Sequence, residues 1–302
     1  MRPIPFRALL LVPAFATALP ASAQAFDPPT QARGWAHQDR DFSFTFFDAS
    51  TRALVTWDKS FGVMNTLSLA KLKDAPSMWW MDRYNNAWVV CGDTLYFVTK
   101  EGKVDSKDKL PAEVADAAWD SGTGFVLLYK TATPYLEMRD MKGGSVLWSH
   151  GTKPKKGETA ARAFYRVCMK VLPGGDAQVF FTDGANLDMT VLSAKTGDPV
   201  ARTAFKLNGQ PGPALDYAKA DPGPLCPLLG KEAIYAAVDS ATLPAGTAPG
   251  LNGLLLAKLD LSSSAITFEP TGLTPDNRFI GIVDGQAAFI KAAGGLAFVA
   301  VQ

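Results

Sequence analysis

Histidine and cysteine are scarce in this chain of 302 residues, and their scarcity excludes several classes of site. The only histidines are His37 and His150, so a histidine-based metal site or a Ser-His-Asp triad has to use one of them. The three cysteines, Cys91, Cys168 and Cys226, form no CxxC or CxxCH motif. We therefore expect no structural metal site and no haem, and the chain is not a disulfide-rich scaffold.

An excess of charge of either sign is also lacking. The chain has 30 basic and 29 acidic side chains, and charged residues make up only 20% of it. A near-neutral protein has little overall attraction for nucleic acid or for anionic membranes, so neither is expected as the partner. Aromatic residues reach 11%, which favours buried strands over disorder or a coiled coil.

Long apolar runs are missing beyond the N-terminus, so we expect no membrane span. Residues 1–25 combine Arg2 and Arg7, an apolar stretch over 8–19, and small-x-small cleavage signals that end at Ala23 and Ala25. The apolar stretch is too short to cross a bilayer. We expect a signal peptide that is removed after Ala25 or, alternatively, after Ala23. The rest, 26–302, is expected to form one domain in the periplasm or outside the cell.

What the chain does contain is a repeated unit of four short apolar strands joined by polar or glycine-containing turns. Two copies are clearest, over 77–110 and 116–149, and four further copies follow the same pattern: 42–69, 165–205, 225–269 and 278–302. Repeated four-stranded units are typical of β-propeller blades. The sequence predicts an all-β protein with a single propeller of six blades. Seven blades, or a β-barrel or sandwich in place of a propeller, are the alternatives.

The last copy supplies only three strands. We expect the mature N-terminus, within 30–41, to provide its fourth strand and so to close the ring.

Three turns show a resemblance to a known family. They are Ser193–Val200 (SAKTGDPV), Lys142–Trp148 (KGGSVLW) and Lys100–Val104 (KEGKV). These turns resemble those of quinoprotein-type (PQQ-like repeat) extracytoplasmic β-propellers. The resemblance implies a propeller and, in members that are enzymes, pyrroloquinoline quinone and calcium. This chain lacks an adjacent cysteine pair, a tryptophan in every blade and a carboxylate cluster for calcium, so we expect no cofactor and transfer no functional residue.

In a propeller, the connections within a blade alternate between two faces. Strands one to two and three to four connect on one face, and here all those turns are short. The other connections lie on the opposite face and include every long loop: 150–163, 208–224, 241–252 and 270–277. We call these the short-turn face and the long-loop face. Long loops in compact domains are usually functional, so the long-loop face is the predicted working face.

The candidate binding residues are polar or basic and fall on this face. A basic patch follows His150, two residues lie in a proline-rich loop, and three begin innermost strands. The full set is His150, Lys153, Lys155, Lys156, Tyr165, Arg166, Asp216, Tyr217 and Arg278. The basic patch favours an acidic or anionic partner.

Cys168 and Cys226 occupy equivalent early positions in the innermost strands of consecutive blades. A disulfide between them is possible only if these strands approach closely enough, and adjacent inner strands of a propeller splay apart.

Two functions remain open. The first is a binding or scaffold module whose long-loop face binds another extracytoplasmic protein or a polymer. The alternative is an enzyme with its site at the mouth of the central channel, either a quinoprotein-like oxidoreductase or a metal-assisted lactonase or lyase. Only this alternative calls for pyrroloquinoline quinone or calcium.

Overall fold

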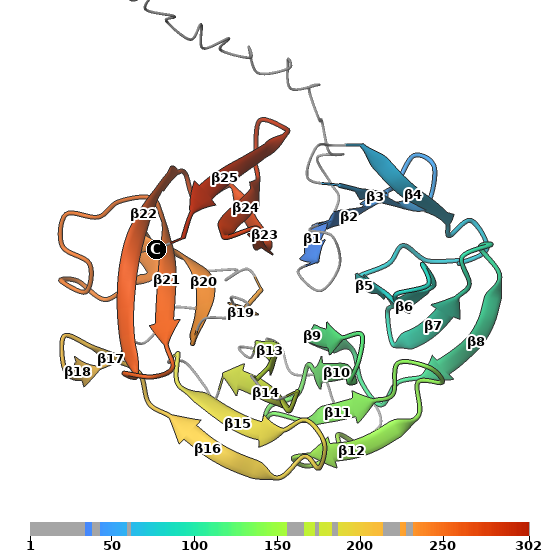
Figure 1. The fold of residues 1–302 in the computed structure, drawn as a ribbon, viewed down its shortest axis with the longest axis horizontal. Helices are drawn as coiled ribbons and strands as arrows, with labels where there is room; N and C mark the ends of the chain where they lie inside the picture. The colour runs from blue at the N-terminus through green and yellow to red at the C-terminus, as the bar shows by residue number, and fades with distance from the viewer. Residues whose placement is uncertain are drawn as a thin grey trace, which may run out of the picture.

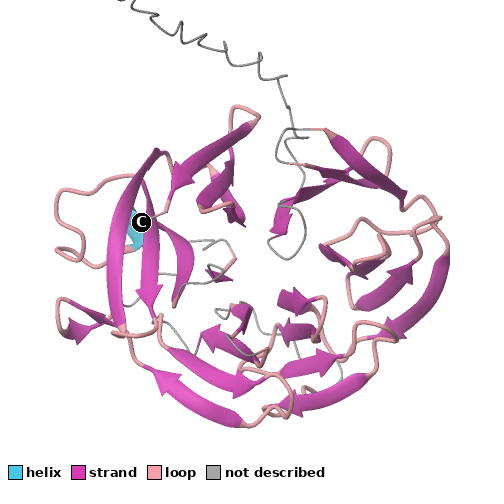
Figure 2. Ribbon diagram, viewed as in Figure 1, coloured by secondary structure: helices cyan, strands magenta, loops and turns pink. Residues whose placement is uncertain are grey.

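The computed structural model is a β-propeller of six blades arranged around one axis (Figure 1). It describes residues 34–37, 43–58, 62–155, 166–172, 175–182, 187–213, 224–227 and 232–301. Within these ranges the only helix is a single 3-10 turn, η1 (Ser240–Thr242), and the rest of the regular structure is strand (Figure 2). No helix in the described ranges is long and apolar enough to cross a membrane. The prediction of an all-β propeller with six blades is confirmed.

The first four blades each contain four antiparallel strands, numbered from the axis outwards. Blade 1 contains β1 (Gly34–His37), β2 (Ser43–Asp48), β3 (Ala53–Trp57) and β4 (Val63–Ser68). Blade 2 contains β5 (Met78–Met81), β6 (Ala87–Cys91), β7 (Thr94–Val98) and β8 (Val104–Lys109). Blade 3 contains β9 (Val114–Asp120), β10 (Gly124–Tyr129), β11 (Leu136–Arg139) and β12 (Val146–His150). Blade 4 contains β13 (Val167–Val171), β14 (Ala177–Thr182), β15 (Met189–Ser193) and β16 (Pro199–Thr203).

The last two blades depart from this plan in opposite ways. Blade 5 contains β19 (Cys226–Pro227), β20 (Ala233–Asp239), β21 (Leu254–Asp260) and β22 (Ala265–Leu273), and the hairpin of β17 (Lys206–Leu207) and β18 (Gln210–Pro211) extends it beyond β22. Blade 6 contains only β23 (Arg278–Val283), β24 (Gln286–Ile290) and β25 (Leu296–Ala300) within the described residues.

The two inner strands of blade 2 are apolar throughout, because each blade is covered on both faces by its neighbours. All residues of β5 and β6 are buried, whereas five of the six residues of β8, the outermost strand of the same blade, are exposed. A strand buried on both faces has no need to alternate apolar and polar residues. This explains why the inner strands appear in the sequence as unbroken apolar runs.

Two tryptophans connect neighbouring blades. Trp88 of blade 2 donates its indole N–H to a backbone carbonyl in blade 3 (3.0 Å), and Trp148 of blade 3 donates to one in blade 4 (2.8 Å). Each ring packs against a glycine, Gly144 or Gly197, whose φ of +70° or +77° closes a turn. These glycines belong to two of the turns that carry the family resemblance, so both turn geometry and packing between blades require them.

The N-terminal strand pairs differently from our prediction. We expected residues 30–41 to complete blade 6, but β1 pairs with β2 and forms the innermost strand of blade 1. It also contacts β23, so the N-terminal segment does lie at the junction of the first and last blades. Pairing with β2 closes a much shorter loop than pairing with β25, and its entropic cost is lower. Apolar side chains from both blades fill the junction: Phe44, Phe46, Ile280, Val283, Ala288 and Ile290.

The prediction of a long loop over 270–277 is wrong. Residues 270–273 belong to β22, so the connection to blade 6 is only 274–277. Pro270 is tolerated in this strand because it lies opposite Leu255 at a β-bulge, where the regular ladder is interrupted. The loop over 241–252 is present and joins β20 to β21 on the long-loop face. The other two, 150–163 and 208–224, are described only in part, and the second begins with the β17–β18 hairpin.

Candidate functional site

The innermost strands of blades 3 to 6 begin at the long-loop face, and each has a polar or ionisable residue near this end. Asp116 lies on β9, Arg166 directly precedes β13, Cys226 begins β19 and Arg278 begins β23. Neighbouring innermost strands in this series contact one another. Together with Cys168 on β13, these residues form what we call the channel-mouth group.

Asp116 connects blades 3 and 4 through hydrogen bonds. Its side chain is 3% exposed, and its two carboxylate oxygens accept hydrogen bonds from the backbone N–H groups of Ala117 (3.0 Å) and Val167 (2.9 Å). Val167 begins β13, so the carboxylate satisfies a buried donor of the next blade. A buried carboxylate held by backbone donors is the kind of group that fixes strand positions.

Cys168 and Cys226 are both free thiols in the structure. Cys168 packs in the apolar cluster between blades 4 and 5, while the half-buried Cys226 packs against the cluster between blades 5 and 6. The disulfide is therefore not formed here, and it stays a prediction for the oxidised protein. The two side chains belong to different clusters because they point to opposite sides of blade 5.

Both thiols are protonated at neutral pH. Burial raises the pKa of Cys168 well above its ordinary value, and the neighbouring Cys226 and Asp116 raise it further. Burial, followed by the Asp116 carboxylate, also raises the pKa of Cys226. Only the thiolate is a nucleophile or a good metal ligand, so neither cysteine is activated for such chemistry.

Lys170 lies on the same strand as Cys168 but nearer the short-turn face. It is 7% exposed, and burial lowers its pKa, an effect that the carboxylate of Glu232 and the thiol of Cys168 oppose. We assign it no role, because nothing in the described residues identifies a ligand for it.

The five predicted binding residues that the structure describes divide into two sets. His150 ends β12, the outermost strand of blade 3, and its ring lies 5.6 Å from that of Phe181 in blade 4. Lys153 and Lys155 follow it and are exposed, so these three residues lie at the rim. Arg166 directly precedes β13 and Arg278 begins β23, so both lie next to innermost strands. Four further candidates lie outside the described residues: Lys156, Tyr165, Asp216 and Tyr217.

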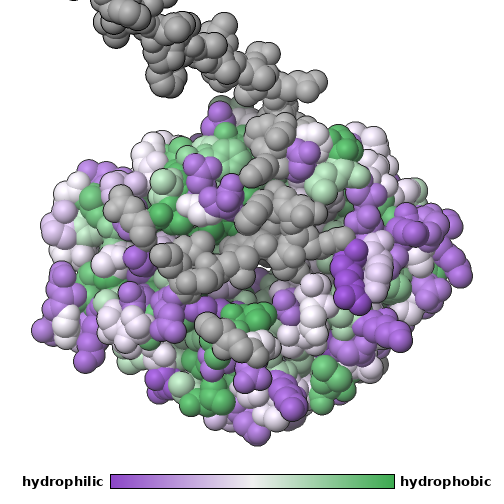
Figure 3. All heavy atoms as spheres, in the orientation of Figure 1, coloured by the Kyte–Doolittle hydropathy of each residue, from purple (hydrophilic) through white to green (hydrophobic). Residues whose placement is uncertain are grey.

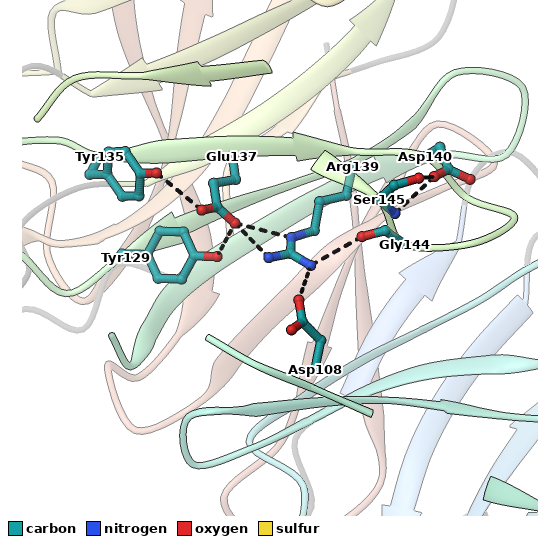
Figure 4. A network of polar contacts seen from close by, with 8 residues as sticks. All are labelled: Asp108, Tyr129, Tyr135, Glu137, Arg139, Asp140, Gly144 and Ser145. Carbon is teal, nitrogen blue, oxygen red and sulfur yellow. Dashed lines mark hydrogen bonds and ion pairs between the residues drawn. The ribbon is translucent and has the colours of Figure 1, made fainter. Parts of the chain in front are cut away.

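The structure also contains a buried polar cluster that the sequence analysis missed. Figure 4 shows Glu137 of β11 at its centre, accepting hydrogen bonds from the hydroxyls of Tyr129 (2.7 Å) and Tyr135 (3.0 Å). Arg139 donates to Glu137 through Nε (3.1 Å) and Nη2 (2.7 Å), and through Nη1 to Asp108 of blade 2 (2.6 Å). Burial, followed by the Glu137 charge, raises the pKa of Tyr135 to about 12.

This cluster has a structural role. Glu137 and Arg139 are nearly inaccessible, each is satisfied by several partners, and the Asp108 contact links blades 2 and 3. A sequence signal for it exists, since an acidic and a basic residue two positions apart on a strand share one face.

Within the described ranges, no group of three or more His, Cys, Asp or Glu side chains is placed to hold a metal ion.

No family model and no curated protein matches this sequence. The fold is similar to that of several solved structures. An inactive virginiamycin B lyase from Staphylococcus aureus, solved with quinupristin, is 12% identical with a TM-score of 0.54, over 94% of this chain and 83% of that one. A chain of a mitotic checkpoint complex is 11% identical with a TM-score of 0.53, over 99% of both chains. A protein from Bacteroides fragilis is 11% identical with a TM-score of 0.51, over 90% of this chain and 81% of that one.

At these identities the similarity shows the fold alone. The propeller that the quinoprotein-type resemblance implied is confirmed, while membership of that family stays a prediction.

Proposed function

We propose that this protein is an extracytoplasmic binding or scaffold module whose long-loop face binds another protein or a polymer. The observation that carries the proposal is the position of the longest fully described connection, 240–253, on the face where the exposed Lys153, Lys155 and Arg278 also lie. The location outside the cytoplasm rests on the predicted signal peptide.

The connection over 240–253 has a fixed base and an exposed tip. Asp239 accepts a hydrogen bond from the N–H of Ala241 (2.9 Å), and the N–H of Ser240 donates to the carbonyl of Gly253 (3.0 Å). Beyond this base, exposed residues include Pro244, Ala245, Gly246, Pro249 and Gly250. Proline restricts the loop before binding, which lowers the entropic cost of forming a complex.

The cations on this face favour a partner with acidic groups. Exposed charges at the edge of an interface mainly increase the association rate and the specificity. The channel-mouth group adds a surface near the axis but no activated nucleophile, because both of its thiols are protonated at neutral pH. An enzyme remains the competing prediction, and pyrroloquinoline quinone or calcium belongs to it.

Charge reversal tests the proposal. The Lys153→Glu, Lys155→Glu double variant should reduce capture of the partner from a native extracytoplasmic extract by about tenfold, because each exposed charge pair contributes roughly 0.2–1 kcal/mol and reversal adds repulsion. The matched control, Lys100→Glu with Lys195→Glu, changes two exposed lysines on the short-turn face and should leave capture unchanged. Loss of capture in the control, with retention in the double variant, would contradict the assignment of the working face.

A further inference from the structure

The charged side chains that remain unpaired differ between the two faces of the propeller. We call a charged side chain unpaired when it has neither a hydrogen bond nor an ion pair with another described residue. On the long-loop face, the described connections carry four exposed lysines of this kind: Lys71, Lys73, Lys153 and Lys291. The other described basic residues of this face have partners: Arg52, Lys109, Lys130, Lys155, Arg166 and Arg278.

Contacts with neighbouring connections place these lysines on the long-loop face. Arg52 lies in the β2–β3 turn of this face, and its guanidinium donates to the carbonyl of Leu72 (2.5 Å), which lies between two of the lysines. The backbone N–H that follows Lys291 donates to the side chain of Asn277 (3.3 Å), just before β23. Lys153 follows the end of β12 by three residues. The four lysines are therefore distributed around the ring, in blades 1, 3 and 6 and the connections that follow them.

The carboxylates of the same face are nearly all paired. Asp93 and Glu113 form ion pairs with lysines, and Asp116 accepts two backbone N–H groups. Further carboxylates accept hydrogen bonds in turns and loops: Asp48, Asp188, Asp239 and Asp276. Asp74 alone among the described carboxylates of this face is unpaired. The unpaired charge in the described part of this face is therefore mostly positive.

The short-turn face has no such excess. Its described connections contain three unpaired lysines and three unpaired carboxylates: Lys100, Lys142, Lys195, Asp176, Asp198 and Glu232. The near-neutral composition of the whole chain thus conceals an excess of cations on one face.

Exposed apolar side chains lie away from the long-loop connections. The large ones among the described residues belong to strands or to a turn of the short-turn face: Val63, Met64, Tyr84, Val146, Leu147, Val171, Val200 and Phe298. The core of a protein–protein interface is usually apolar and rich in aromatic residues. The described connections of the long-loop face offer cations and polar backbone instead, which suit a hydrophilic partner.

We propose that the long-loop face binds a polysaccharide that carries carboxylate groups. This rests on the proposed function and selects the polymer from the two kinds of partner named there. A long chain with a carboxylate on each sugar can reach lysines in several blades at once, and Figure 3 shows hydrophilic residues on every side of the ring. A lysine ammonium is a flexible point charge without a fixed fork of donors, so it accepts carboxylates at irregular spacing.

Binding of this kind depends strongly on salt. Each lysine that contacts a polyanion releases counterions, so the logarithm of the association constant falls linearly with the logarithm of the salt concentration. Removal of one contacting lysine lowers the slope by up to about one. The slope therefore reports contacts directly, and a change in stability alone leaves it unaltered.

Alginate, a polymer of uronic acids, is the probe, and dextran is its uncharged counterpart. The full chain is titrated with each polymer at several salt concentrations, beside the triple variant Lys71→Gln, Lys73→Gln, Lys291→Gln. We expect binding of alginate but not dextran, a loss of about tenfold in the variant at low salt, and a smaller salt slope. The matched control, Lys100→Gln, Lys142→Gln, Lys195→Gln, removes the same charge from the short-turn face and should bind as wild type does. All six lysines are exposed, so both variants should melt as wild type does.

Three results overturn the inference: no binding of alginate, equal losses in both triple variants, or tighter binding of polyglutamate than of alginate. The last result identifies an acidic polypeptide as the partner. Failure of the inference is distinguishable from failure of the proposed function. If alginate does not bind while the Lys153→Glu, Lys155→Glu variant still loses capture of a protein, the proposed function stands and only the polysaccharide is wrong. If the control triple alone loses alginate, the working face is wrong and both fail.

Discussion

At the residue scale, glycines in turns contribute to stability in two separable ways. Gly197 has a φ of +77° and lies against the ring of Trp148, whereas Gly209 has nearly the same φ (+79°) with nothing within 4 Å of an added Cβ. The left-handed region penalises any L side chain, but only the first site also lacks space. Comparing substitutions at Gly197 and Gly209 therefore separates the cost of backbone strain from the cost of steric contact between blades.

We predict that Gly197→Ala destabilises the protein more than Gly209→Ala. At both sites the left-handed backbone conformation should cost an alanine about 1–2 kcal/mol of stability. At Gly197, displacement of the Trp148 ring should cost about 1–3 kcal/mol more. Urea unfolding of both variants measures the difference. Equal losses would show that the contact between Trp148 and Gly197 contributes nothing to stability.

Asp48 and Asp260 illustrate a second residue-scale effect. The hydroxyl of Ser50, with that of Thr51, lowers the pKa of Asp48 to about 2, and Ser262 does the same for Asp260. A carboxyl group whose pKa is depressed by folding stabilises the protein above its unfolded pKa and loses that contribution as the pH falls through its folded pKa.

We therefore predict that wild type is more stable than the Asp48→Asn, Asp260→Asn double variant at pH 5, and that the difference disappears as the pH falls from about 4 to about 2. Melting temperatures across this range measure it. Asp105→Asn, an exposed carboxylate in no such turn, provides the control. A difference that is constant with pH would contradict the assigned cause.

At the element scale, β1 is the strand whose pairing the sequence analysis misjudged. The count of three strands in the last copy predicted a strand within 30–41, where β1 does lie, but assigned it to blade 6, which is wrong. The pattern contains no information on which neighbour it pairs with, because β2 and β25 are both apolar strands. The short connection to β2 favours local pairing. The extension of β22 through residues 270–273 was not predicted, because a proline usually marks the end of a strand. Pro270 fits within β22 only because it lies at a β-bulge.

We predict that a chain beginning at Phe42 has a lower melting temperature than one beginning at Thr30, which retains β1. Loss of β1 exposes the inner edge of β2 and removes the contact with β23. A loss of 1 kcal/mol lowers the melting temperature of a domain of this size by roughly 2–4 °C, and the loss of a strand should exceed that. Identical melting temperatures would show that β1 is dispensable for closing the ring.

At the scale of the whole molecule, the sequence predicted which face carries the long connections but not how the candidate residues group there. His150 and Arg166 lie 16 residues apart in the sequence, yet the first ends an outermost strand and the second precedes an innermost one. Asp116 shows the reverse, because its carboxylate meets Val167, which lies 51 residues further along the chain. No pattern of consecutive residues predicts which side chains meet between blades.

The sequence by itself determined the strands, the six blades and the glycine turns, because each depends on a few consecutive residues. Apolar runs define strands covered on both faces, and a positive φ selects glycine wherever a turn requires it. Only the tertiary structure decided the partner of β1, the linking of blades through Arg139 and Asp108, and the placement of the two thiols in different apolar clusters. Those features depend on side chains and edges that meet from distant parts of the chain, and their energies arise only once the blades pack around the axis.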